Sequence, residues 1–255
     1  MKIRILLLIF SIIFLVCYII KLFNLSYKNE YFYNDKIHII NIINLEIDKE
    51  RLKKIKSNCD KFNINYNVIK AIDGLKYKLT QNDKIYLKNV NYDINIEKGV
   101  LGCHLSHIRL LEDFCKKKNK EYLIVVEDDT QIIEQNFDNI IDLILNKQKL
   151  NFDIIFLATS ENLKPNTKLV SQINDKYALY DSKNKWLKQG AIFYIISLHG
   201  ALDILSKYYN SKCKTAIDWF YINEMKQPLL LYPNLGIHAS KRDSTNSSVL
   251  KKKIS

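Results

Sequence analysis

Short apolar runs alternate with longer segments of helical periodicity along most of this chain. The runs, rich in β-branched residues, are 37–43, 66–71, 122–127, 152–157, 176–180, 190–196 and 229–232, and their lengths suit buried strands. The segments with apolar residues at helical spacing are 49–62, 99–115, 136–149, 198–208 and 216–220. This alternation predicts an α/β fold, with a mainly parallel, twisted sheet and flanking helices.

The amino-terminal segment is apolar and uncharged from Ile5 to Ile20, with Lys2 and Arg4 before it. About 20 such residues span a bilayer, so residues 1–24 are predicted to be an uncleaved transmembrane anchor. A cleaved signal peptide is the alternative. The very short tail before the segment favours a type II orientation, with the body in the lumen of the endoplasmic reticulum or Golgi. In a bacterium, the protein would be membrane-associated.

Polarity divides the rest of the chain. Residues 25–36 are polar and tyrosine-rich and predict a short stem, and residues 37–240 carry all the strand and helix signals. Residues 75–98 lack periodicity and predict a long loop, as do residues 159–175. The last segment, 241–255, is a polar carboxyl-terminal tail.

The net charge of +12 raises the question of a polyanionic partner. The lysines are spread along the whole chain, without a compact basic stripe interleaved with aromatic residues, which argues against nucleic-acid binding. A basic surface also suits an anionic membrane or a nucleotide diphosphate. The five cysteines show no CxxC pair and no zinc-type spacing.

The strongest chemical signal is the acidic triplet Glu127-Asp128-Asp129, which directly follows the apolar run 122–127. Ligands collect at the carboxyl ends of strands in open α/β sheets. Alternation along an extended chain places Glu127 and Asp129 on one side and Asp128 on the other. The triplet predicts a site for Mn²⁺ or Mg²⁺ bridging a diphosphate. The alternative is a solvated acidic turn that caps the next helix.

A pair of histidines lies in the segment before the triplet. His104 and His107 are three residues apart, so they are neighbours on a helix surface. They are either a metal-binding pair or residues that stabilise structure or contact substrate.

The order of these pieces resembles glycosyltransferase family 25, which contains bacterial lipooligosaccharide galactosyltransferases and collagen galactosyltransferases. The resemblance covers residues 37–240, the predicted glycosyltransferase domain. The matching residues are Ile42–Leu45, Arg51, Ala71–Gly74, Gly99, Gly102, Cys103, Ser106, His107, Glu127–Asp129, Gly190–Ser197 and Ile217–Phe220.

The resemblance implies a GT-A-like fold and a nucleotide-diphospho-sugar donor. The donor-binding residues that it implies are Asn44, Arg51, Asp73, Gly74, Ser106 and His107. Asp129 would hold the metal, Glu127 would contact metal or ribose, and Asp128 would be structural or touch the ribose. Apart from the resemblance, His238 in the late loop is a further candidate to complete the metal shell.

Inverting transfer needs a carboxylate that accepts the proton of the acceptor hydroxyl. Asp218 is the candidate for this base, because it lies in the matched helix after the core strands, and Glu224 is the second candidate. The alternative for Asp218 is a helix-surface acid beside a buried Trp219.

The predicted function is therefore transfer of a hexose, galactose or glucose, from a UDP-sugar to a hydroxyl of a glycan, lipooligosaccharide or glycoprotein. The alternative is a catalytically silent family member that acts as a lumenal binding or scaffold protein. A nucleotidyltransferase would need a Gly-rich phosphate loop near the first strand, and Asn44-Leu45-Glu46-Ile47 provides none.

Overall fold

The computed structural model describes residues 38–78, 80–81, 98–117, 119–147, 151–159, 162, 164–183, 190–210 and 217–239. These all belong to Ile37–Ser255, one of the two units into which the chain divides. The predicted anchor, stem and polar tail, and most of the loop 75–98, lie outside the described residues. No helix in the described part has the length and apolar character needed to cross a membrane.

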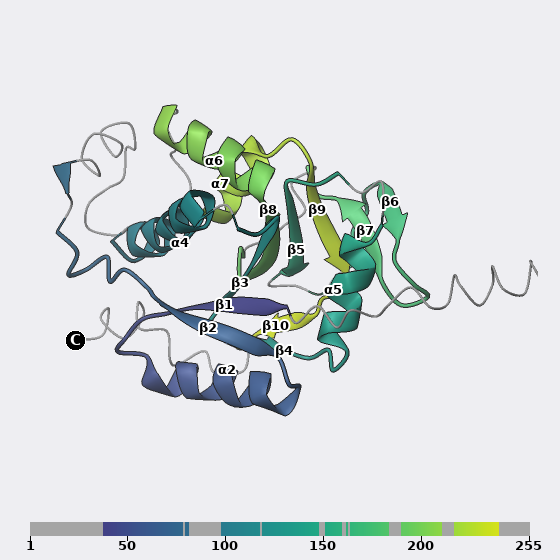
Figure 1. The fold of residues 1–255 in the computed structure, drawn as a ribbon, viewed down its shortest axis with the longest axis horizontal. Helices are drawn as coiled ribbons and strands as arrows, with labels where there is room; N and C mark the ends of the chain where they lie inside the picture. Colours follow the sequence, from purple (N-terminus) through teal and green to yellow (C-terminus); the bar gives the residue numbers. More distant parts are fainter. Residues whose placement is uncertain are drawn as a thin grey trace, which may run out of the picture. The chain divides into compact units, whose positions relative to one another are not determined.

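The centre of the fold is a mixed sheet of eight strands in the order β2-β1-β3-β8-β5-β9-β7-β6 (Figure 1). The strands are β1 (Ile39–Asn44), β2 (Asn65–Lys70), β3 (Tyr122–Glu127), β5 (Ile154–Ala158), β6 (Leu169–Gln172), β7 (Ala178–Asp181), β8 (Phe193–Ser197) and β9 (Pro228–Tyr232). β1 is parallel to β2 and β3, and β5 is parallel to β9. β7 and β8 run against the other strands of this sheet. Most strands of the sheet thus share one direction, and the two that oppose it are β8, between β3 and β5, and β7, between β9 and β6.

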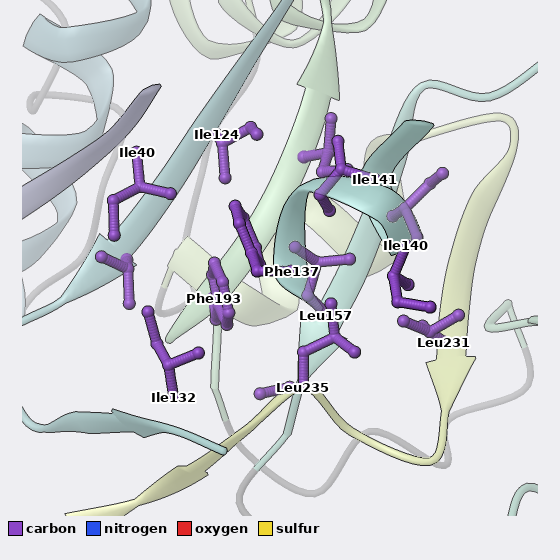
Figure 2. Packing of buried hydrophobic residues seen from close by; sticks show 14 of the residues in the cluster. Ile40, Ile124, Ile132, Phe137, Ile140, Ile141, Leu157, Phe193, Leu231 and Leu235 are labelled. Atoms are coloured by element: carbon purple, nitrogen blue, oxygen red, sulfur yellow. The ribbon is translucent and has the colours of Figure 1, made fainter. Parts of the chain in front are cut away.

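Helices cover both faces of this sheet. α4 (Lys98–Lys117), α6 (Leu198–Asn210) and α7 (Ile217–Glu224) pack on one face, and α2 (Lys49–Lys61) and α5 (Phe137–Leu145) pack on the other (Figure 1). Each face therefore has its own apolar core. Figure 2 shows the core beneath α5, where Phe137 and Phe193 stack with ring centroids 5.9 Å apart.

The two cores explain why the strand sequences are apolar without interruption. In β3, Leu123 and Val125 face the α4 side, while Ile124 and Val126 face the α5 side. All four are buried, and each is stabilising by about 1.5–3 kcal/mol relative to exposure. A strand with helices on both sides has no face on which polar residues are favoured.

Three strands were not predicted from the sequence. β6 falls inside the predicted loop 159–175, and β4 (Thr130–Ile132) and β10 (Gly236–His238) form a small antiparallel sheet of their own. β6 is an edge strand whose Leu169 is 50% exposed, so it lacks the burial pattern that marks a strand in sequence. β4 and β10 are three residues long, too short for periodicity to register.

The antiparallel direction of β8 is what brings its amino-terminal end to the candidate site. β1, β2 and β3 all end at the same edge of the sheet, and β8 begins there. The Glu127 N–H donates to the carbonyl of Ile192, at 2.8 Å, just beyond the end of the β3–β8 ladder. The segments that follow β1, β2 and β3 therefore meet the segment that precedes β8.

Candidate active site

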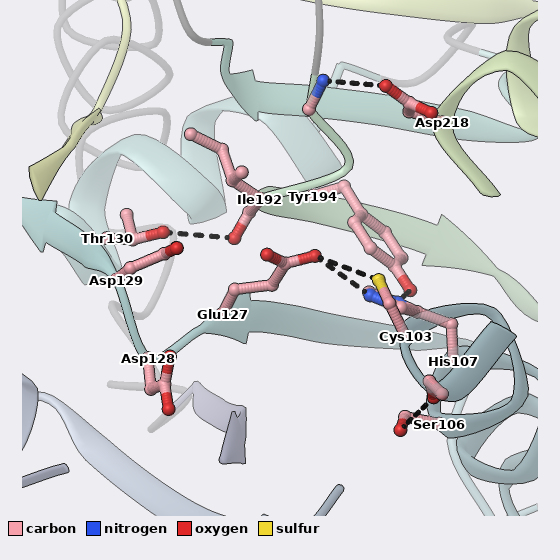
Figure 3. Close-up of polar contacts among 12 residues, drawn as sticks. Cys103, Ser106, His107, Glu127, Asp128, Asp129, Thr130, Ile192, Tyr194 and Asp218 are labelled. Carbon is pink, nitrogen blue, oxygen red and sulfur yellow. Dashed lines mark hydrogen bonds and ion pairs between the residues drawn. The ribbon is translucent and has the colours of Figure 1, made fainter. Parts of the chain in front are cut away.

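The acidic triplet lies in a tight turn between β3 and β4. The Asp128 N–H donates to the Ile43 carbonyl at 3.2 Å, and the Thr130 hydroxyl donates to the Ile192 carbonyl, also at 3.2 Å. These bonds tie the turn to β1 and to the start of β8. Glu127 and Asp129 point to one side and Asp128 to the other, as strand alternation predicts (Figure 3).

Asp129 is a nearly buried carboxylate with one partnered and one unpartnered oxygen. Its Oδ2 lies 3.3 Å from Nε2 of His238 and 3.5 Å from Nη1 of Arg51. Burial opposes ionisation, but the His238 hydrogen bond and the Arg51 charge outweigh it, and the pKa of Asp129 is below its ordinary value. In turn, the bond to Asp129 raises the pKa of His238. Oδ1 is buried and has no hydrogen-bond partner in the part of the chain that the structure describes.

Asp128 is held on the opposite side by β1 and α2. Asn44 Nδ2 donates to its Oδ2 at 2.6 Å, and Arg51 Nη1 lies 3.5 Å from its Oδ1. Burial raises the pKa of Asp128 to about 6, even though the Asn44 hydrogen bond and the Arg51 charge lower it. Asn44 and Arg51, predicted to contact the donor, therefore also hold two carboxylates of the triplet in place.

Glu127 turns toward helix α4. Its Oε1 lies 3.2 Å from Nε2 of His107 and accepts a hydrogen bond from the thiol of Cys103 at 3.7 Å (Figure 3). The other ring nitrogen of His107, Nδ1, is 2.8 Å from the hydroxyl of Tyr194, whose hydroxyl is 3.3 Å from that of Tyr221. The His107 side chain is fully buried. Burial, followed by the charges of Glu127 and Asp218, raises the pKa of Cys103, so it is a neutral thiol.

The segment after β2 is fastened against the start of α4. The Ile72 N–H donates to Ser106 Oγ at 2.8 Å, and Ser106 Oγ donates to the Gly102 carbonyl at 2.6 Å. A Cβ on Gly74 would lie 1.6 Å from the Lys98 carbonyl oxygen, so only glycine fits. Ser106 thus positions the loop containing Asp73 and Gly74.

Asp73 shapes this loop itself. Its Oδ1 accepts the Leu75 N–H at 3.0 Å, and its Oδ2 lies 3.5 Å from Nζ of Lys76, which is mostly exposed. The predicted donor-pocket residues Asp73 and Gly74 therefore lie together, beside the amino-terminal turns of α4.

Asp218 lies in the first turn of α7 and joins the same cluster of charges. Its Oδ2 accepts the Gly190 N–H at 3.0 Å and its Oδ1 accepts the Trp219 N–H at 2.9 Å. The Gly190 bond places Asp218 near the end of β3, because Ile192, two residues after Gly190, accepts the Glu127 N–H. Glu224 is at the other end of α7, about 9 Å along the helix, where its carbonyl accepts from Lys207. The structure brings Asp218, but not Glu224, to the cluster.

The structure answers the open question about His104 and corrects the prediction for Trp219. His104 packs against Tyr208 and Phe220, with ring centroids 5.3 and 5.8 Å away, and does not pair with His107. The α4 residue that lies beside His107 is Cys103, one turn earlier, and both side chains contact Oε1 of Glu127. The i,i+4 spacing of Cys103 and His107 was the signal for this pair. Trp219, described from sequence as buried, is 37% exposed.

Comparison with known proteins gives one family match. The sequence model of glycosyltransferase family 25 (LPS biosynthesis protein) matches residues 37–221. No curated protein matches the chain.

Similar solved structures share little sequence with this chain. One is a glycosyltransferase involved in the glycosylation of the major capsid of PBCV-1, with 8% identity and a TM-score of 0.40 over 85% of this chain and 98% of that one. A197 from STIV has 11% identity and a TM-score of 0.38 over 76% and 81%. The mannose-1-phosphate geranyltransferase from Thermus thermophilus has 9% identity and a TM-score of 0.37 over 82% and 79%.

Proposed function

This chain belongs to glycosyltransferase family 25, and we propose that it transfers a hexose, galactose or glucose, from a UDP-sugar to a hydroxyl of a glycan, lipooligosaccharide or glycoprotein. Family membership makes it a transferase that uses a nucleotide-sugar donor and a glycan-type acceptor. The observation that carries the finer proposal is Asp129, an ionised carboxylate with an unpartnered buried oxygen at the carboxyl edge of the sheet. The finer fold assignment proposed with it is GT-A-like.

Asp129 and its neighbours suit a divalent cation. A buried carboxylate oxygen without a hydrogen-bond partner is costly unless a ligand satisfies it. Mn²⁺ or Mg²⁺ would be held by Asp129 and His238, with Glu127 as the further ligand suggested by the family resemblance. The ion supplies positive charge that stabilises the leaving diphosphate.

The donor-binding residues lie at the ends of β1 and β2. Arg51 is a fixed positive charge beside the triplet, and an arginine fork also suits phosphate oxygens. Asn44 and Asp128 lie with it on the side of β1 and α2, where the nucleoside would bind. The loop with Asp73 and Gly74, fastened by Ser106, forms the neighbouring wall.

Asp218 is the proposed general base of an inverting reaction. It would accept the proton of the acceptor hydroxyl while that oxygen bonds to the anomeric carbon and the bond from this carbon to the diphosphate breaks. The two backbone N–H groups on its oxygens fix the orientation of the carboxylate. The exposed ring of Trp219 lies beside it and offers a face for the acceptor sugar.

The cellular setting belongs to the proposal as well. Residues 1–24 would anchor the protein as a type II single-pass membrane protein, with its catalytic domain in the lumen of the endoplasmic reticulum or Golgi. In a bacterial source, the protein would be membrane-associated.

The test is a panel of UDP-sugars offered to the full-length protein in detergent, with and without Mn²⁺, and with UDP release as the readout. We expect release from one or two of the donors, dependent on Mn²⁺, and a loss of about 100-fold or more in Asp129→Asn. Asp175→Asn, which changes an exposed acid, is the matched control.

Undiminished turnover in Asp129→Asn would remove the triplet from the mechanism. UDP binding without turnover of any sugar would instead identify the catalytically silent alternative.

A further inference from the structure

We propose that Cys103, His107 and Oε1 of Glu127 form a zinc site next to the Asp129–His238 pair, with Glu127 as the residue that the two sites would share. One ligand atom from each residue lies within 4.8 Å of the other two among the described residues. The separations from Glu127 Oε1 are 3.2 Å to His107 Nε2 and 3.7 Å to Cys103 Sγ.

These separations fit a tetrahedral zinc ion. Zinc binds nitrogen and oxygen at about 2.0–2.1 Å and thiolate sulfur at about 2.3 Å, which places ligand atoms about 3.3–3.6 Å apart. The Glu127–His107 and Glu127–Cys103 distances lie within about 0.2 Å of those edges. Small side-chain adjustments would therefore suffice for these two edges, and the third, between Cys103 and His107, is within 4.8 Å.

The surroundings of His107 also favour a metal ligand. Histidine ligands are commonly oriented by a hydrogen bond to the ring nitrogen that does not bind the metal. The Tyr194 hydroxyl is 2.8 Å from Nδ1, and Tyr221 supports that hydroxyl in turn. This leaves Nε2 directed at Glu127 and Cys103. The ring is fully buried, so its orientation is fixed by packing.

The three ligands come from rigid elements. Cys103 and His107 lie one turn apart on the same face of α4, and Glu127 is the last residue of β3. Glu127 has a side chain that is 24% exposed, which gives an ion a route of entry from solvent. Three protein ligands leave a fourth position for water or a bound molecule.

The ligand set distinguishes this site from the one at Asp129. A thiolate, an imidazole and a carboxylate together select zinc, whereas Mg²⁺ and Mn²⁺ favour oxygen ligands. In the metal-free protein, the Cys103 thiol donates to Glu127 Oε1, and zinc binding would release that thiol proton. Zinc binding here does not depend on the proposed glycosyl transfer, although Glu127 lies between the two sites.

The test uses the full-length protein in detergent. Zinc affinity is measured by competition with a chromogenic zinc chelator, and Co²⁺ is used as a spectroscopic substitute. We expect one equivalent of zinc and a thiolate-to-Co²⁺ charge-transfer band. Cys103→Ser should lose the band and bind zinc at least about 100-fold more weakly, the upper end of the cost of altering an outer-shell partner.

Two variants locate the ion. Cys115→Ala removes another thiol of α4, which is buried in the core, and should keep both zinc binding and the cobalt band. Asp129→Asn should also keep both, while losing Mn²⁺ binding. Loss of zinc in Asp129→Asn would place the ion at the acidic turn and overturn the proposal.

A measurement on the unmodified chain covers the case in which Cys103→Ser does not fold. Zinc should protect Cys103, but not the other cysteines, from alkylation, as read by peptide mass spectrometry. Equal alkylation of Cys103 with and without zinc would overturn the proposal. So would unchanged zinc affinity in Cys103→Ser.

Discussion

Replacement of Ser106 by alanine tests whether this residue positions the loop after β2 or contacts the donor directly. In the structure, its hydroxyl accepts the Ile72 N–H at 2.8 Å and donates to the Gly102 carbonyl at 2.6 Å. Both partners are backbone groups, and Ser106 is 3% exposed. We therefore expect Ser106→Ala to lower stability first, and to weaken donor binding only as a consequence of a looser loop.

The expected loss of stability in Ser106→Ala follows from the hydrogen bond that each backbone partner of Ser106 loses. Gly102 lies four residues before Ser106 in α4, so its carbonyl keeps the helical hydrogen bond and its loss is small. The Ile72 N–H loses its acceptor, and an unsatisfied amide costs about 1–3 kcal/mol. Because Ile72 is only partly buried, water can replace part of that bond, and we expect about 1–2 kcal/mol. For a domain of this size, this corresponds to a fall of about 2–8 °C in Tm.

The assay is chemical denaturation followed by circular dichroism, together with calorimetric titration of UDP. Ser57→Ala, at an exposed position of α2, is the matched control and should change stability by no more than about 0.5 kcal/mol. If Ser106→Ala were as stable as the wild type but bound UDP much more weakly, Ser106 would be a donor contact. The argument for a positioning role would then fail.

Two further predictions concern the acceptor and the pH dependence of stability. Trp219→Ala should raise the KM for the acceptor more than it lowers kcat, and Trp219→Phe should restore part of the acceptor affinity. An unchanged acceptor KM in Trp219→Ala would show that the exposed ring does not contact the acceptor. Glu134 accepts hydrogen bonds from Lys176 and Tyr177, and these outweigh burial and hold its pKa below the ordinary value of 4.5. A carboxylate with a lowered pKa stabilises the folded state above pH 4.5, so Glu134→Gln should lower the free energy of unfolding by about 1–2 kcal/mol at pH 7. Urea denaturation should show the stability difference between wild type and variant shrinking as the pH falls below 4.5. A difference that stayed constant from about pH 7 to about pH 3 would contradict this account.

The predicted strands β1, β3, β5, β8 and β9 are buried on both faces, whereas β2, also predicted, is an edge strand of exposed and half-buried residues. Ile124 and Val125 face opposite cores, so the whole of β3 reads as apolar. β6 could not be found in this way, because Leu169 and Val170 are exposed at the edge of the sheet. The direction of β8 was also beyond prediction, since an apolar run has the same composition whichever way it runs.

Residue types and the family resemblance predicted which residues belong to the candidate site, but not all of the contacts between them. The structure brings Asp129 and His238, two of the predicted metal ligands, into contact, and their roles stay predictions. The choice between His104 and Cys103 as the neighbour of His107 depends on the face that α4 turns to the sheet, because spacings of three and four are equally compatible with contact. Helical spacing alone does not fix that face.

The pairing of β10 with β4 sets the order in which this site can be completed during synthesis. His238 reaches Asp129 only through a strand more than 100 residues later in the chain, after every strand of the large sheet has been made. The family match ends at residue 221, so a fragment cut at that boundary would lack β9 and β10 and would leave Asp129 without its histidine. A nascent chain therefore carries the acidic turn with Arg51 beside it and acquires His238 last, whereas a chain truncated at residue 221 never acquires it.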